Sequence, residues 1–469
     1  MPRKNISRRK FIGTIGCAAM GGATMMSSLI NLKAAGALAS PAYKMQSFDP
    51  QSDYRALICI LLSGGNDSYN MLVPMEEGEY EDYQLTRSNL ALEYNTLLEV
   101  NPLSGKKYGF HPSMPAVQQM FQDGDLAIVS NVGTLIEPIQ NKNDFFDRLT
   151  KLPLGLFSHI DQIQQWQTSI PNDRSSLGWG GRMADLLRSS NSNQDISMNI
   201  SLSGNNYFQS GNNSTEYTIS PYNGGSTGIE GFGGETYLDS IKTHAIRNIL
   251  EQQYTDVFQQ TYVDITKTSQ EAHELFSSTV NSVFFDTVFS GERLSQSMRM
   301  IARTIASQQT LGLNKQIFFL EVPGWDHHAE ILDIHASMLT DVSRALGEFN
   351  EAMKEIGMHD KVTTFTISDF ARTLNSNGNG TDHAWGGNVM VMGGAVKGNR
   401  FYGEYPELNT NSTLDFGGGV LIPKISTDEY FAELAMWFGV SASDLPLVLP
   451  NINTFYDPLS GVAPLGFLL

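Results

Sequence analysis

The sequence contains very little cysteine, which excludes a fold held together by disulfides. Of the 469 residues only Cys17 and Cys59 are cysteines, and Cys17 lies in an N-terminal segment that we expect to be removed. Cys59 alone cannot form an intrachain disulfide, and it stands in an apolar run typical of a buried strand. The mature chain must therefore be stabilised by its core.

Basic residues are also scarce. The chain has 31 Lys and Arg against 49 Asp and Glu, a formal net charge of −18, and loss of residues 1–39, which hold six basic residues and no acidic one, changes it to −24. Such an acidic chain repels the phosphates of nucleic acids and anionic lipids. We therefore expect neither a nucleic-acid partner nor a membrane-surface partner.

A long uninterrupted apolar run is missing as well. Arg8-Arg9 are followed by a weakly apolar, Gly- and Ala-rich stretch to about Leu32 and then by Ala37-Leu38-Ala39. This order predicts a twin-arginine export signal, residues 1–39, cleaved after Ala39. The repeated glycine and serine argue against a stable transmembrane anchor. We expect the mature protein in the periplasm, outside the cell or at the cell surface.

Dense apolar runs without alternation predict strands that are buried on both faces, at 56–62, 125–130, 316–322, 361–367 and 388–393. Apolar residues spaced by three or four predict a helix over 334–356, ending before Gly357. The strands at 316–322 and 361–367 and this helix form one βαβ unit. We predict an α/β fold with three layers, in which helices flank a mostly parallel central sheet.

The middle of the chain differs in composition. Residues 189–235 are rich in Asn, Ser and Gly, which is typical of loops or a small β insertion. Residues 236–310 return to helical periodicity, with one apolar stripe: Leu294, Met298, Ile301 and Ile305. We therefore predict a single domain over 40–469 that carries an insertion at about 189–310.

Acids and histidines follow the predicted strands. They are Asp67, Asp326, His328, Asp369 and, after a glycine-rich turn, Asp382 and His383. Because ligands bind at the carboxyl ends of parallel strands, we expect these residues to form one site. Asp326, His328 and His383 can hold one ion, and Asp67 with Asp369 can supply a second subsite. Alone, each of these residues is equally well explained as a cap or turn residue.

The donor atoms suggest which metal such a site takes. Carboxylates together with imidazoles suit Zn²⁺, Mn²⁺ or Fe, whereas carboxylates alone suit Mg²⁺ or Ca²⁺. We predict a divalent metal, with Zn²⁺ first and Ca²⁺, Mg²⁺ or Mn²⁺ as alternatives.

Ser158 and Arg372 are the candidate catalytic residues. Ser158 opens a helical pattern, where backbone amides favour an anion and where serine is also an ordinary N-cap. The entrance of the same site can be lined by His159, Asp161 and Trp166. Arg372 can bind a phosphate or sulfate with two hydrogen bonds, or it can form a structural ion pair.

A series of motifs extends this interpretation beyond single residues. In order, the chain contains SGGND, GFHPSM, DGDLAIVSNVG, FSHIDQ, GWGGR, GWDHH, SDFART and GTDHAWGGNVMVMGGAVKGNRFYG. With the export signal, the series resembles the secreted bacterial family of domain of unknown function 1501, which itself resembles the alkaline phosphatase superfamily of phosphatases, sulfatases and phosphoglycerate mutases.

The resemblance implies an alkaline phosphatase-like fold and a role for each candidate residue. Ser158 takes the nucleophile position; the implied metal ligands are Asp67 after the first strand, the pair Asp326 and His328, Asp369 in the second subsite, and the late His383. Phe370 and Trp385 stand where the superfamily commonly has histidine, which removes possible ligands. The sulfatase signature is also missing, because neither Ser113 nor Ser169 begins a Ser-x-Pro-x-Arg sequence.

Two functions follow from the sequence. The first is an exported metal-dependent hydrolase of phosphate or sulfate-like esters, small or polymer-borne, with a serine nucleophile at a one- or two-metal site. The alternative is a non-catalytic binding or assembly protein on the same fold, with at most a structural metal and a protein partner at the cell envelope.

Replacing Arg8 and Arg9 by lysine tests the predicted export signal. We expect the folded precursor to accumulate in the cytoplasm, because a receptor reads the arginine pair and not the charge alone. Cell fractionation followed by immunoblotting measures this. Normal export of the double variant would show that the arginine pair is incidental.

Overall fold

The apolar run after Tyr54 forms the central strand β1 (Arg55–Ser63) of the computed structural model, which describes residues 54–468 except 104, 148, 223 and 410. Seven of the nine β1 residues are buried, as expected for a strand covered on both faces. The predicted export signal over 1–39 lies outside the described residues. No helix in the described part of the chain is long and apolar enough to cross a membrane.

The main sheet has nine strands among the described residues, in the order β11-β5-β10-β9-β1-β8-β6-β7, with β12 paired to β5. Beyond β1 they are β5 (Leu126–Gly133), β6 (Asn199–Ser201), β7 (Tyr217–Thr218), β8 (Lys315–Pro323), β9 (Val362–Ser368), β10 (Gly387–Met392), β11 (Phe401–Tyr402) and β12 (Ile425–Ser426). Only the pairings of β10 with β5 and β9 are antiparallel. The predicted mostly parallel α/β fold is confirmed.

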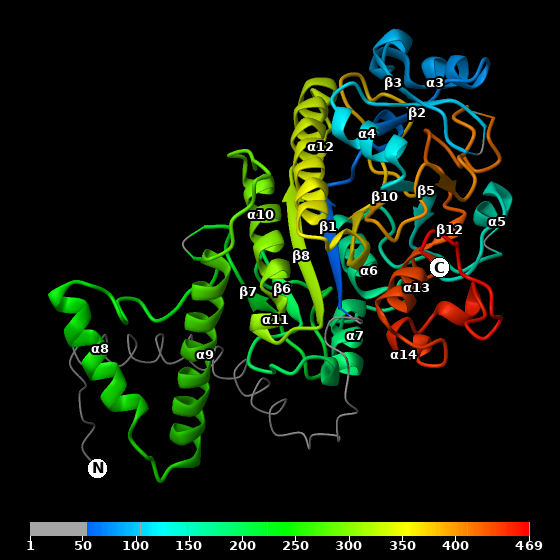
Figure 1. The fold of residues 1–469 in the computed structure, drawn as a ribbon. Coiled ribbons are helices and arrows are strands. Elements are labelled where there is room, and N and C mark those ends of the chain that lie inside the picture. Colours follow the sequence, from blue (N-terminus) through cyan, green and yellow to red (C-terminus); the bar gives the residue numbers. More distant parts are fainter. Residues whose placement is uncertain (1–53, 104, 148, 223, 410, 469) are drawn as a thin grey trace, which may run out of the picture. The chain divides into compact units, whose positions relative to one another are not determined.

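Helices cover the sheet on both faces (Figure 1). Leu57, Cys59 and Leu61 of β1 share a core with α7 (Trp179–Leu187) and α13 (Thr427–Phe438). The other face carries α4 (Pro115–Asp123), α10 (Arg293–Ala306) and α12 (Ile331–Glu355), which pack side by side. The predicted stripe of α10 is buried in this layer.

The predicted βαβ unit exists as β8-α12-β9, but its two strands are not neighbours. Leu57 of β1 pairs with Ile317 of β8 on one side and with Thr363 of β9 on the other. Because β1 lies between them, all three carboxyl ends meet at one point of the sheet edge.

The predicted insertion contributes to the main sheet, since β6 and β7 extend it beyond β8. Residues 227–275 form a separate compact unit, with α8 (Tyr237–Leu250) and most of α9 (Val257–Asn281).

The other α-helices and strands of the described chain are α2 (Ser68–Met71), β2 (Leu72–Pro74), α3 (Glu79–Arg87), β3 (Leu98–Val100), β4 (Tyr108–Phe110), α5 (Lys142–Phe146), α6 (His159–Thr168), α11 (Gln308–Leu311) and α14 (Leu445–Val448). Strands β2, β4 and β3 form a small antiparallel sheet.

Asp428, in the first turn of α13, yields a prediction about stability and pH. Burial raises the pKa of this carboxyl to about 8, although nearby Arg182 opposes the shift. Its contribution to stability is therefore fully present below the unfolded pKa near 4 and is lost as the pH rises through about 8. We expect Asp428→Asn to gain about 4 kcal/mol over the parent protein between pH 5 and pH 9 in urea unfolding. An equal difference at both pH values would show that the protonation of the buried carboxyl does not change in this range.

Candidate functional site

The carboxyl ends of β1, β8 and β9 hold the loops of the candidate site very close together. Asp369, directly after β9, accepts a hydrogen bond from the backbone nitrogen of Gly64, directly after β1, at 3.0 Å. Gly64 has a φ of +122°, and a side chain there would collide with the backbone nitrogen of Asp326. Glycine is thus required where the loops after β1 and β8 meet.

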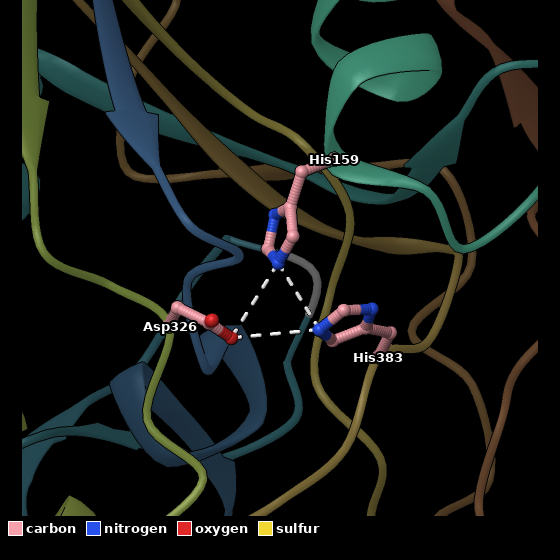
Figure 2. Close-up of side chains that lie close together, drawn as sticks. All are labelled: His159, Asp326 and His383. Atoms are coloured by element: carbon pink, nitrogen blue, oxygen red, sulfur yellow. Dashed lines mark hydrogen bonds and ion pairs between the residues drawn. The ribbon is translucent and has the colours of Figure 1, made fainter.

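Three histidines and Asp326 lie at this edge, and Figure 2 shows two of the histidines, His159 and His383, converging on Asp326. His159 Nε2 lies 3.1 Å from His383 Nε2 and 3.5 Å from Asp326 Oδ1, and His383 Nε2 lies 3.5 Å from the same oxygen. His328 Nε2 lies 2.9 Å from Asp326 Oδ1 and 3.1 Å from His383 Nε2. The four side chains are 25–47% exposed, so the cluster can be reached from solvent.

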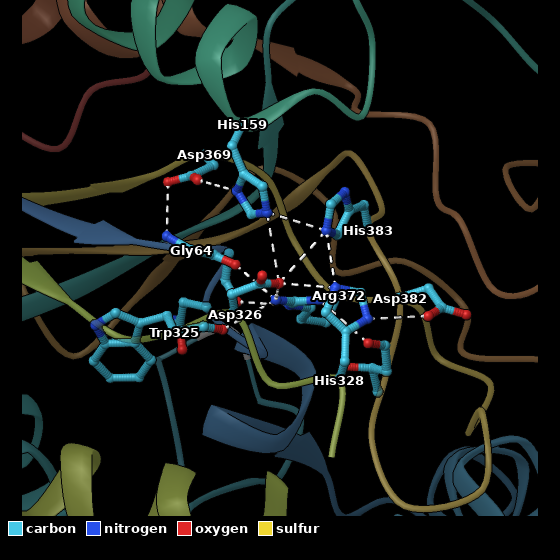
Figure 3. A network of polar contacts seen from close by, with 12 residues as sticks. Gly64, His159, Trp325, Asp326, His328, Asp369, Arg372, Asp382 and His383 are labelled. Atoms are coloured by element: carbon cyan, nitrogen blue, oxygen red, sulfur yellow. Dashed lines mark hydrogen bonds and ion pairs between the residues drawn. The ribbon is translucent and has the colours of Figure 1, made fainter.

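Each imidazole is held through its other nitrogen, and Figure 3 shows the partners of His159 and His328. His159 Nδ1 lies 2.6 Å from Asp369 Oδ2, His328 Nδ1 lies 3.2 Å from Asp382 Oδ1, and His383 Nδ1 donates to the Phe157 carbonyl at 2.8 Å. These partners are acceptors, so Nδ1 carries the hydrogen and a neutral ring presents its Nε2 lone pair. The lone pairs of His159 and His383 meet at the Asp326 carboxylate, and His328 also contacts this carboxylate.

This arrangement fits a divalent cation. Lone pairs that face each other at 3.1 Å repel unless a proton or a cation lies between them. Around Zn²⁺, tetrahedral ligands at 2.0–2.1 Å lie about 3.3 Å from one another, and the three contacts among His159, Asp326 and His383 span 3.1–3.5 Å. Histidine ligands also commonly donate Nδ1–H to a carboxylate or carbonyl, as they do here.

The direction of the pKa shift differs among the side chains of the cluster. The hydrogen bond to Asp369 raises the pKa of His159, whereas burial lowers the pKa of His383. Partial burial raises the pKa of Asp326, but Arg372 and the nearby histidines outweigh this and lower it. Asp326 is therefore a carboxylate at neutral pH.

Arg372 lies beneath the cluster and not at its surface. Its side chain is fully buried and pairs with Asp326. It also donates to the carbonyls of Gly64 (2.8 Å), Gly65 (3.1 Å), Thr381 (3.2 Å) and Trp325 (3.3 Å). The sequence predicted that Arg372 can bind a phosphate or sulfate, which requires an exposed guanidinium. The observed guanidinium is buried and is hydrogen-bonded to groups of the protein itself.

Asp67 does not join the other predicted ligands. Its buried carboxylate pairs with the equally buried Arg87 of α3, which also binds Asn70 and the Thr373 carbonyl. Among the described residues, no contact links Asp67 with Asp326, His328 or His383. Asp369 is present at the site but lies behind His159. The second subsite predicted from Asp67 and Asp369 is therefore not assembled.

Ser158 stands at the N-cap position of α6, but its side chain makes no capping hydrogen bond. Arg174 and then Ser158 hydrogen-bond to Asp161 and lower the pKa of that carboxyl. No contact in the described part of the chain joins the Ser158 hydroxyl to the cluster. The residue of this segment that reaches the histidine cluster is His159, which the sequence analysis placed only at the entrance of the site. The position of His159 at the start of a helix, next to a predicted nucleophile, was the sequence feature that could have indicated its place in the site.

Comparisons with known proteins give a family match over part of the chain. Residues 236–416 match the family described as "Protein of unknown function (DUF1501)". No curated protein sequence matches the chain.

Solved structures are similar at low sequence identity. The phosphoethanolamine transferase A from Neisseria meningitidis is 10% identical, with a TM-score of 0.35 over 98% of this chain and 66% of that one. The lipoteichoic acid synthase LtaP from Listeria monocytogenes is 9% identical, with a TM-score of 0.30 over 81% and 79%. The PsFucS1 sulfatase from Pseudoalteromonas sp. is 8% identical, with a TM-score of 0.33 over 90% and 72%.

Arg372→Ala tests how far the site loops depend on the buried guanidinium. Because the substitution leaves the carbonyls without donors and Asp326 without its partner, we expect a loss of about 3–5 kcal/mol in the free energy of unfolding, measured in urea. Arg174→Ala, at an arginine that is 69% exposed and also paired with an aspartate, is the matched control and should change little. Equal effects of the two substitutions would contradict the structural role of Arg372.

Proposed function

We propose that this protein is an exported hydrolase of phosphate or sulfate-like esters that uses one divalent cation, Zn²⁺ first, held by His159, Asp326 and His383, with a fourth position open to water or the ester. The observation that carries the proposal is the convergence of two Nε2 lone pairs and one carboxylate oxygen at spacings of 3.1–3.5 Å. Each of these histidines is already oriented as a metal ligand by a separate acceptor.

The donor set also suits an anionic substrate. With a single carboxylate among three protein ligands, a divalent cation would keep a net positive charge, and it would polarise an ester oxygen and lower the pKa of a water molecule. The partial exposure of the four side chains leaves room for an ester group to approach. The choice of phosphate or sulfate-like esters rests on the resemblance of the sequence motifs.

The remaining residues would position the ligands. Arg372 fixes the Asp326 carboxylate, while Asp369 and Asp382 set the rings of His159 and His328. The Phe370 ring packs against His159 and His383, with centroid distances of 4.8 and 4.6 Å. This buried ring occupies the side on which a second ion would need ligands, which favours a single-ion site.

The attacking group in this proposal is a water molecule. Ser158 remains the other candidate, but within the described chain no contact joins its hydroxyl to the cluster, whereas its interaction with Asp161 lowers the pKa of that carboxyl. We also propose that the cation is taken up before export, because the twin-arginine route carries folded proteins.

A Zn²⁺ titration tests the cation site. We expect about one equivalent to bind and to stabilise the protein by about 2.7 kcal/mol at a hundredfold excess over Kd. His159→Ala should weaken binding strongly, whereas His244→Ala, at an exposed histidine of α8, should not. Calorimetry and thermal unfolding with and without chelator measure both effects. Equal binding by the two variants would rule out the His159 cluster as the site.

The proposed ester hydrolysis is tested with three substrates: 4-nitrophenyl phosphate, its diester and 4-nitrophenyl sulfate. We expect the Zn²⁺-loaded protein to release nitrophenol, His159→Ala to be inactive and Ser158→Ala to keep its activity. Loss of activity in Ser158→Ala with unchanged Zn²⁺ binding would identify the serine as the nucleophile. Zn²⁺ binding without hydrolysis of any ester would contradict the enzyme and favour the binding or assembly protein.

A further inference from the structure

A second candidate site lies in a cavity that shares no residue with the histidine cluster. Its volume is about 470 Å³, within the range of small-molecule sites. It is enclosed by Glu79 and Asp82 of α3, by Lys106 and Tyr108, and by the segment from Phe401 to Asn409. Neither the proposed function nor the sequence motifs involve this cavity.

One wall of the cavity is aromatic. Tyr108 lies edge to face with Phe401 at 4.4 Å between ring centroids, and Tyr405 lies 5.1 Å from Tyr108 on another side. The Tyr108 side chain belongs to a residue that is only 4% exposed, yet no described residue hydrogen-bonds to its hydroxyl. An unpartnered hydroxyl on a buried ring that lines a cavity is available to a polar ligand atom.

The cavity carries an excess of negative charge. Glu79, Asp82, Glu404 and Glu407 line it, against the single ammonium of Lys106, which pairs with Glu79 at 2.5 Å. Asp82 accepts a hydrogen bond from Asn409 at 3.1 Å, and within the described chain neither Asp82, Glu404 nor Glu407 forms an ion pair. These three carboxylates are therefore free to pair with a cation from solution.

The spacing of the carboxylates does not suit a bare metal ion. In the described part of the chain, the group of acids and histidines close enough to share an ion is the one around His159, and no such group is formed by the cavity acids. The cavity is also much larger than one ion. Separated carboxylates next to aromatic faces suit a larger cation whose charge is shielded by carbon atoms.

Lys106 shows that the cavity stabilises an ammonium group. The hydrogen bond that Lys106 donates to Glu79 raises the pKa of Lys106, and Glu76 and Glu404 contribute in the same direction. An ammonium group in the cavity would be near lining carboxylates and beside Tyr108 and Phe401.

We propose that this cavity binds a small organic ammonium ion. Its charged head lies against Tyr108 and Phe401 and is neutralised by Glu404, Glu407 and Asp82. The Tyr108 hydroxyl then bonds to a polar substituent of the ligand.

Calorimetry with choline and its uncharged isostere 3,3-dimethylbutan-1-ol, on the full chain at low ionic strength, tests the proposal. We expect choline to bind about tenfold or more tightly than the alcohol, because only choline gains from the carboxylates and the ring faces. Equal affinities, or no binding of choline, would overturn the proposal.

Matched variants test whether choline binds in this cavity. The double substitution Glu404→Gln and Glu407→Gln should weaken choline binding about tenfold, since it removes two charges without changing side-chain size. Glu351→Gln, at a glutamate of α12 that is 64% exposed, should leave binding unchanged. Tyr108→Phe should weaken choline but not tetramethylammonium, which has no hydroxyl. Equal losses in the double variant and in Glu351→Gln would show that choline responds only to net charge and would overturn the site.

Discussion

The buried guanidinium of Arg372 is the constraint on which the candidate site depends. It gathers carbonyl groups from the loop after β1, the loop after β8 and the turn before β10, and it holds Asp326 at the rim. Each of these groups would cost free energy if it were buried without a donor. One side chain thus satisfies the backbone of three segments and at the same time sets the position of a proposed ligand.

The histidine pair after β8 shows how the same segment serves the core and the site. His327 is 4% exposed and faces inward, near His335 and Trp325, whereas His328 is 46% exposed and points to the cluster. Burial lowers the pKa of His327, and the same effect keeps His335 neutral. Neighbouring identical residues therefore have different chemistry because the backbone turns them to opposite sides.

Much of the fold followed from the sequence because the central strands are continuous apolar runs with few alternatives. The position of β1 between β8 and β9 did not, because a βαβ unit is compatible with either adjacent strands or a strand between them. At the site, Asp326, His328 and His383 were predicted and do lie together. Asp67 followed a strand in the same way, but nothing in the sequence distinguishes a carboxylate that binds a metal from one that neutralises a buried Arg87. His159 was underrated because it comes from a helix start and not from a strand end.

The order of β9, β1 and β8 in the sheet also determines when the site can form during folding. The contact of Gly64 with Asp369 joins residues 305 positions apart, and Arg372 reaches Gly64 across 308. Contacts of such long sequence separation form slowly, because much chain entropy is lost before they are made. A nascent chain that ends before β9 already holds His159, Asp326 and His328, yet it lacks Asp369 and Arg372, which orient His159 and Asp326. The cluster is therefore completed late, after most of the polypeptide has been synthesised.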